Sequence, residues 1–301
     1  MKLKIWFQET RPSFLLLPVV LAFLGTSIAW YDGFLNIGYA VLAFVGMLFG
    51  HISVNVLNEY FDYKAGIDFE TVKTPFSGGS GILPAALLKP KQVLWFGIIS
   101  FLIALPIGVY FVIAAGWLLL PVLVIGAICI LFYSPVITRL GWPEWAPGLG
   151  LGMLPILGFY YVQTSAYTWP VVIAAVPSGI LVYNLLLLNE FPDAAADRKG
   201  GKKTLPIIAG LPATGRVYSV LTMIVYLWIM GGVIAGVLPP FASLALLTLP
   251  FAVKAMKGAL NYKEMIIPAM ANNVLVVLAT QFLLGVGYIL SRLVVIPCLL
   301  T

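Results

Sequence analysis

Charged residues are scarce in this 301-residue chain: Asp, Glu, Lys and Arg make up 9% of it, and only 11 residues are acidic. Hydrophobic residues make up 61%, and the mean hydropathy is +1.04. A water-soluble domain needs a more polar surface, so the composition excludes one and indicates a polytopic membrane protein. The net charge of +6 then fits anionic lipid headgroups rather than nucleic acid, and membrane lipid is the expected surrounding.

Cysteine and histidine are also rare, with two residues and one residue respectively. Cys129 and Cys298 lie in apolar stretches, which favours small packed side chains over a disulfide or a metal pair. His51 lies one turn before Asn55 on a predicted helix. It could assist a site there, or it could simply pack inside a helix bundle.

Nine apolar segments are long enough to cross a bilayer as helices. They cover residues 12–31, 35–60, 91–115, 117–135, 145–165, 169–189, 213–236, 240–256 and 266–290. The predicted fold is therefore an all-α, polytopic membrane protein with nine transmembrane helices and a single domain, residues 1–301. Spans one to four and five to eight could form two pseudo-repeat halves, because each half places an acidic cluster after its second span.

The basic residues indicate how these spans are oriented. With the N-terminus in the cytoplasm and nine alternating crossings, all of the 17 Lys and Arg residues except Arg292 fall on the cytoplasmic side. The opposite orientation would place nearly all of them outside, against the positive-inside rule. We therefore predict a multi-pass protein of the cell membrane whose acidic clusters both lie on the cytoplasmic side.

The first acidic cluster follows the second span. It holds four of the 11 acidic residues: Glu59, Asp62, Asp68 and Glu70. On a helix Asn55, Glu59 and Asp62 are spaced to project from one face. Gly66 permits a turn that brings Asp68 back towards them. Oxygen ligands clustered in this way suit a hard divalent cation that keeps some of its water.

A second cluster follows the sixth span and is predicted to lie in the loop 191–212. Asn189-Glu190-Phe191-Pro192-Asp193 repeats the shape of Asn58-Glu59-Tyr60-Phe61-Asp62, and Asp197, Arg198, Lys199, Lys202 and Lys203 follow. Solvated helix flanks are the simpler interpretation, but two matched clusters near a membrane favour a functional site. Carboxylates that hold magnesium, with Lys and Arg on the outer phosphate oxygens, are what a diphosphate substrate needs.

The connection between the second and third spans, residues 61–90, is long and polar. Its segment 73–84 is rich in Gly and Ser and too polar to cross the membrane. The segment could cap a cavity, or its backbone amides could line an anion site. A flexible linker is an equally good interpretation of the same residues.

A diphosphate site at the mouth of a membrane bundle suits a polyprenyl diphosphate, with its head at the carboxylates and its tail in an apolar cavity open to lipid. Magnesium would promote ionisation of the allylic C–O bond, and aromatic faces would stabilise the cation until an electron-rich acceptor attacks. The aromatic candidates are Tyr60, Tyr63, Phe159, Tyr160, Tyr161 and Tyr183.

The motifs resemble those of the UbiA superfamily of intramembrane prenyltransferases over nearly the whole chain. They are Asn55-x-x-Asn58-Glu59-x-x-Asp62-x-x-x-Gly66-x-Asp68, Asn189-x-x-x-Asp193-x-x-x-Asp197-Arg198 and Gly201-Lys202-Lys203-Thr204-Leu205. The resemblance implies nine helices around a central cavity, Mg²⁺ as cofactor, and transfer of a polyprenyl group from its diphosphate to an aromatic acceptor. The motifs look most like the branch that acts on 1,4-dihydroxy-2-naphthoate in menaquinone synthesis.

The resemblance also implies roles for single residues. The expected catalytic residues are Asp62, Asp68, Asp193 and Asp197. The expected metal ligands are Glu59, Asp62, Asp68, Asn189, Asp193 and Asp197, and the expected diphosphate-binding residues are Asn55, Asn58, Lys73, Asn189, Arg198 and Lys202. Two positions depart from the pattern. Glu59 stands where Asp is common, and Pro192 stands where this branch usually has Arg, so one cation is missing.

Other functions stay open at this point. The acceptor could be 4-hydroxybenzoate, homogentisate, a porphyrin or an ether-lipid glycerol phosphate. A carrier for magnesium or organic anions is an alternative of another class. A carrier needs pathways to both membrane faces, whereas the ionisable residues of this chain gather on one side.

Overall fold

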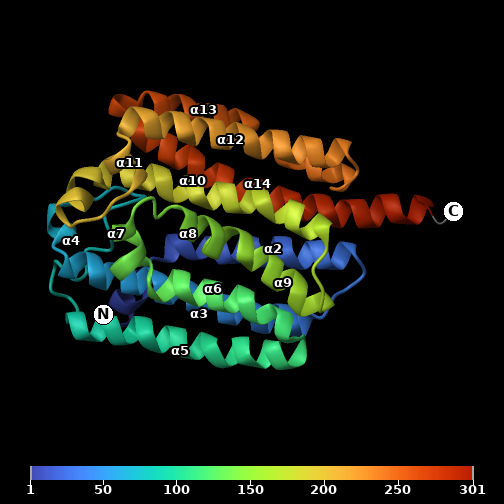
Figure 1. Ribbon diagram of the computed structural model, residues 1–301, viewed down its shortest axis with the longest axis horizontal. Coiled ribbons are helices and arrows are strands. Elements are labelled where there is room, and N and C mark those ends of the chain that lie inside the picture. The colour runs from blue at the N-terminus through green and yellow to red at the C-terminus, as the bar shows by residue number, and fades with distance from the viewer. Residues whose placement is uncertain (1, 300–301) are drawn as a thin grey trace.

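The computed structural model describes residues 2–299, with side chains through residue 294, and within this range every regular element is helical (Figure 1). Eight segments of the described chain are long and apolar enough to cross a membrane, or nine if one bent pair is a single span. The predicted all-α membrane fold is therefore confirmed. A pseudo-repeat relation between the halves stays a prediction.

The spans match the predicted segments closely. They are η1–α2 (Pro12–Tyr31), α3 (Ile37–Lys64), α5 (Pro90–Ala114), α8–η4–α9 (Trp145–Thr164), α10 (Trp169–Lys199), α12 (Leu211–Ile234), η5–α13 (Pro240–Leu260) and α14 (Tyr262–Leu299). The predicted span 117–135 is the bent pair: η2–α6 (Trp117–Leu131) meets η3–α7 (Tyr133–Leu140) at 62°. Pro135 lies inside η3, where its missing N–H and its ring disturb the helical hydrogen bonds.

Several helices continue beyond their predicted ends, and two of them, α3 and α10, carry acidic residues of the motifs. α3 reaches Lys64 rather than residue 60, and α10 reaches Lys199 rather than residue 189. The prediction that the second cluster lies in a loop was therefore wrong, because Asp193 and Asp197 are helical. α10 continues through Pro192, which costs about 3 kcal/mol in an isolated helix. Here α10 packs against both α12 and α14, and these contacts hold the helix together.

Short helices gather at one end of the bundle, together with the N-terminal helix α1 (Lys2–Glu9). They are α4 (Ile67–Glu70), α7 (Thr138–Leu140) and α11 (Leu205–Ile208) (Figure 1). This is also the end at which α3 and α10 finish. Both acidic clusters are thereby carried to the same end. Cys129 is buried and free, whereas the side chain of Cys298 lies outside the described residues.

A buried polar bracket ties α10, α12 and α14 together beside the apolar core. The Asn273 amide donates to the Asn184 carbonyl at 3.1 Å and accepts from the Tyr218 hydroxyl at 3.0 Å. The Asn184 amide in turn donates to the Thr222 hydroxyl at 3.0 Å. The bracket fixes the rotation of α10, and therefore which of its residues face the site.

We expect Asn273→Leu to destabilise the protein by about 1–3 kcal/mol, because the buried Tyr218 hydroxyl loses its acceptor. Thermal unfolding in detergent measures this as a lowered Tm. Asn272→Leu is the matched control, since Asn272 is only half-buried and its side chain donates to the Pro268 carbonyl oxygen of its own helix. Equal effects of the two substitutions would contradict the role of the bracket.

Candidate functional site

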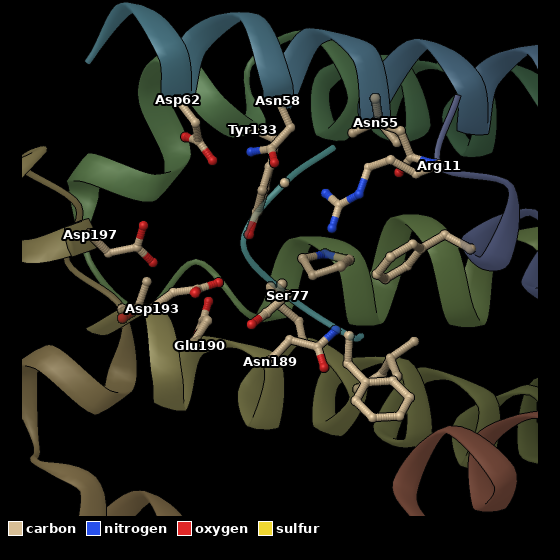
Figure 2. Close-up of a pocket in the computed structure, with 18 of the residues that line it drawn as sticks. Arg11, Asn55, Asn58, Asp62, Ser77, Tyr133, Asn189, Glu190, Asp193 and Asp197 are labelled. Carbon is tan, nitrogen blue, oxygen red and sulfur yellow. The ribbon is translucent and has the colours of Figure 1, made fainter. Parts of the chain in front are cut away.

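The end of the bundle with the short helices holds a cavity of about 160 Å³ (Figure 2). α3 contributes His51, Asn55, Asn58 and Asp62, whose spacing of four, three and four residues places them on one helical face. α10 contributes Asn189, Glu190, Asp193 and Asp197 from the opposite wall. Figure 2 shows the polar groups of the two helices directed towards each other across the cavity.

Asp68 reaches the same cavity through the predicted turn. Gly66 adopts the left-handed conformation, with φ 79°, and α4 begins directly after it. The Asp68 Oδ2 atom has no hydrogen-bond partner. Burial, followed by the nearby carboxylates of Glu59 and Asp62, raises the pKa of Asp68 to about 8. This carboxyl therefore sits in a place that favours a cationic ligand.

Lys202 joins the two motifs. Its Nζ atom lies 2.9 Å from Asp62 Oδ2 and 3.0 Å from Asp197 Oδ1. Burial alone would lower the pKa of Lys202, but the two carboxylates outweigh it and hold the pKa above its ordinary value. The chain thus places a permanent positive charge between its acidic clusters.

Three predicted site residues lie elsewhere. The Glu59 carboxylate does not line the cavity and accepts hydrogen bonds from Ser80 instead. Lys73 is exposed and donates to the Ser80 carbonyl oxygen. Arg198 is also exposed, and its Nη2 atom donates to the Ile207 carbonyl oxygen at 3.1 Å. The remaining predicted residues all lie in the cavity wall.

Several residues that line the cavity were not predicted from the sequence. Arg11 projects into it from the junction of α1 and η1, where its backbone adopts the left-handed conformation with φ 55°. A charged residue directly before the first span was the only available signal. The aromatic side chains of the cavity are Phe14, Phe76 and Tyr133, and none of the six predicted aromatic candidates lines it.

A second cavity of about 530 Å³ adjoins the first between α3, α5, α6 and α9. Among the residues that line it His51 is the single polar side chain, and the others are aliphatic, aromatic or glycine. His51 and Leu151 line both cavities. The His51 Nδ1 atom is buried without a hydrogen-bond partner at this junction. Polar and apolar compartments therefore meet at one point.

The segment 73–84 covers the polar cavity rather than hanging free. Ser77, Gly78 and Gly79 line the cavity, and both glycines have positive φ. Hydrogen bonds of the Thr74 hydroxyl with the Ser77 backbone N–H and hydroxyl fix its turn. The capping interpretation is the one the structure supports.

The donor set fits a divalent metal ion. Four buried oxygen atoms in the cavity wall have no hydrogen-bond partner: Asp68 Oδ2, Asn189 Oδ1, Glu190 Oε2 and Asp193 Oδ1. Oxygen atoms without donors facing them are the ligands Mg²⁺ takes. Within the described chain, no three His, Cys, Asp or Glu side chains are grouped so that they could hold a metal ion by themselves. Oxygen atoms of a bound phosphate would complete the coordination.

Fold and cavity together define a polytopic helical membrane protein with an acidic cavity at one end of its bundle and an apolar cavity beside it. The chain belongs to the UbiA prenyltransferase family, which it matches over residues 15–276. This confirms the family indicated by the two motifs.

Individual relatives agree. The 1,4-dihydroxy-2-naphthoate octaprenyltransferase of Bacillus subtilis (strain 168) is 30% identical over 298 residues, covering 96% of this chain and 93% of that protein. The enzyme of the same name from Haemophilus influenzae is 26% identical over 234 residues, 72% of each chain. The solved structure of a UbiA homolog from Archaeoglobus fulgidus, bound to GPP and Mg²⁺, has a TM-score of 0.61 at 14% identity, covering 97% of this chain and 99% of that one. The last comparison shows a shared fold.

Glu9 should make the stability of the folded protein depend on pH. It is fully buried, and burial together with the Glu59 carboxylate raises its pKa to about 8 from 4.5. Between these values the folded chain holds a proton that the unfolded chain has lost, so stability falls as pH rises, by about 1.4 kcal/mol per unit at most. The loss is complete above the folded pKa.

We therefore expect the wild-type Tm to fall more steeply between pH 5.5 and pH 8 than that of Glu9→Gln, which cannot titrate. Thermal unfolding in detergent across this range is the measurement. Parallel pH profiles of the two proteins would contradict the assignment.

Proposed function

We propose that this protein transfers a polyprenyl group from a polyprenyl diphosphate to 1,4-dihydroxy-2-naphthoate. The observation that carries the proposal is the pairing of two acidic motifs across one polar cavity that adjoins an apolar one. A diphosphate head and a hydrocarbon tail match these two compartments. The names of the relatives from Bacillus and Haemophilus support the choice of acceptor.

The diphosphate end is assigned to the carboxylates. Asp62 and Asp68 from one motif, and Asp193, Asp197 and Asn189 from the other, would hold Mg²⁺ through their oxygen atoms. Bound Mg²⁺ neutralises the departing diphosphate. Asn55 and Asn58 keep the facing wall rigid, because their amides donate to the Thr10 carbonyl and the Ser134 hydroxyl at 3.2 Å and 3.0 Å.

Two cations of the cavity have separate assignments. Lys202 lies among the carboxylates and is assigned to the diphosphate. Arg11 lies at the opposite end of the cavity from Asp197 (Figure 2). We assign its guanidinium to the carboxylate of the acceptor, since a planar fork suits a carboxylate. This supplies the cation that Pro192 removes from the second motif.

The reaction centre is assigned to the junction at His51. The tail of the prenyl diphosphate extends from there into the apolar cavity, and its first allylic carbon lies near the aromatic face of Tyr133, which lines the polar cavity. Such faces attract a developing carbocation. Exclusion of water from this region preserves the cation for the acceptor.

The acidic end of the bundle is assigned to the cytoplasmic side of the cell membrane. The distribution of the basic residues supports this orientation, with Arg292 alone at the other side. Substrates carrying diphosphate and carboxylate groups then reach the cavity from the cytoplasm.

We expect purified protein supplied with geranylgeranyl diphosphate, Mg²⁺ and 1,4-dihydroxy-2-naphthoate to form the prenylated naphthalene, identified by mass spectrometry. EDTA should abolish turnover, because the carboxylates need a metal to hold the diphosphate. 4-Hydroxybenzoate and homogentisate serve as competing acceptors in parallel reactions. Full turnover in chelator, or product with another acceptor alone, would overturn the corresponding part of the proposal.

Lys202 and Arg198 provide a matched pair of cations close in sequence. Lys202→Ala should lower kcat and raise KM for the prenyl diphosphate, because the charge matters most as the leaving group forms. A loss of at least about tenfold in kcat/KM is expected. Arg198→Ala should retain the wild-type constants, since Arg198 lies outside the cavity. Steady-state kinetics of these variants is the measurement. Lys202→Arg is included because it keeps a cation between the carboxylates. Equal constants for Lys202→Ala and wild type would remove Lys202 from the site.

A further inference from the structure

The Glu59 carboxylate is committed to the segment that covers the cavity. The Ser80 backbone N–H donates to both of its oxygen atoms, at 2.8 Å and 3.0 Å. The Ser80 hydroxyl donates to Oε2 at 2.8 Å, and Arg11 Nε lies 3.7 Å from Oε1. Only 1% of the Glu59 residue is exposed. The carboxylate is therefore turned into the loop rather than into the cavity.

The covering segment also touches the second motif. Ser77 and Gly78 of this segment lie beside Asp193 in the wall of the same cavity. One loop is thus held by Glu59 on α3 and meets Asp193 on α10. Of the two contacts, the one to Glu59 holds the loop more firmly, because Asp193 Oδ1 remains without a hydrogen-bond partner.

Gly79 shows how closely the loop lies on the carboxylates. Its φ is +68°, and a Cβ atom at this position would lie 3.3 Å from Asp68 Oδ1 and 3.3 Å from each Glu59 oxygen. Glycine meets both demands, a positive φ and a close approach of the backbone. The Lys73 side chain further pins the loop by donating to the Ser80 carbonyl oxygen. The backbone of this loop therefore forms the roof of the site.

We propose that Glu59 is a positioning residue, and no metal ligand: it fixes the loop 73–84 over the cavity so that water stays away from the prenyl cation. This inference rests on the proposed function. In the transfer, the allylic C–O bond breaks and its electron pair leaves with the diphosphate. An acceptor ring carbon then supplies the pair for a new C–C bond and releases its substituent as a proton or as carbon dioxide.

A displaced loop changes the fate of the cation. Water enters, its oxygen forms the C–O bond, and it loses a proton, so the products are polyprenol and diphosphate. The ratio of polyprenol to prenylated acceptor therefore reports on the loop. A metal ligand at position 59 would instead control metal affinity.

The test compares Glu59→Gln and Ser80→Ala with the control Glu70→Gln, since Glu70 is exposed and pairs with Lys199 at the surface. Glu59→Gln and Ser80→Ala should each raise the polyprenol ratio on the order of tenfold. Mn²⁺ affinity, measured by electron paramagnetic resonance with diphosphate present, should stay within about twofold of wild type, since every ligand remains. Glu70→Gln should match wild type in both measurements. Loss of Mn²⁺ affinity in Glu59→Gln alone would make Glu59 a ligand, and an unchanged polyprenol ratio would refute water exclusion by the loop.

A readout without catalysis separates this inference from the proposed function. Trypsin should cut after Lys73 faster in Glu59→Gln and Ser80→Ala than in wild type, while cleavage after the exposed Lys263 stays constant and reports intact folding. Unchanged cleavage after Lys73 would refute the anchoring role, whatever reaction the protein performs. A wild-type protein that consumes no prenyl diphosphate would instead refute the proposed function and leave the cleavage result standing.

Discussion

The contact of Lys202 with Asp62 and Asp197 is the interaction on which the site depends. Two acidic motifs from helices far apart in sequence repel each other across a cavity whose surroundings are apolar. Removing charges from water costs several kcal/mol per ion, and a cation with good geometry offsets this. Lys202 provides that cation for both motifs: its Nζ atom lies 2.9 Å from Asp62 Oδ2 and 3.0 Å from Asp197 Oδ1. Lys202 thus offsets part of the negative charge, and the acidic groups that remain in the cavity wall favour a bound metal ion.

The helices bring these charges together because they extend beyond their membrane-spanning segments. α3 ends at Lys64 and α10 at Lys199, each extending past its apolar segment. Rigid helices place side chains more precisely than loops do, and a metal site with a diphosphate needs that precision. The polar bracket around Asn184 and Asn273 serves the same end by fixing the rotation of α10.

Much of this arrangement could be predicted from the sequence. The length of the apolar segments predicted the spans, since hydrocarbon thickness dictates helix length. The paired motifs predicted the family and most of the charged residues that line the cavity. Helix ends could not be predicted from hydropathy. Hydropathy indicates which residues lie in lipid, but it does not indicate whether a helix continues beyond the lipid into water. α10, for example, continues past Pro192, where its contacts with α12 and α14 hold the helix together.

Glu59 shows a second limit of the sequence. Its spacing from Asn55 and Asp62 is compatible with one face, but it lies at the edge of that face, where a neighbouring loop decides its direction. Glu190 lies at the matching place in the second motif and does line the cavity. Two chemically identical residues in similar motifs thus face different surroundings, and only the packing of 73–84 distinguishes them.

The two cavities divide the demands of the chemistry between them. Carboxylates, Lys202 and the loop backbone occupy the polar compartment, whereas the apolar one offers no group that could quench a cation except His51 at the junction. A charge-separating reaction needs polar groups at the leaving diphosphate and exclusion of water at the allylic carbon. One uniform pocket cannot meet both requirements. Two adjoining compartments satisfy both, which requires that the covering loop keep water from the junction where they meet.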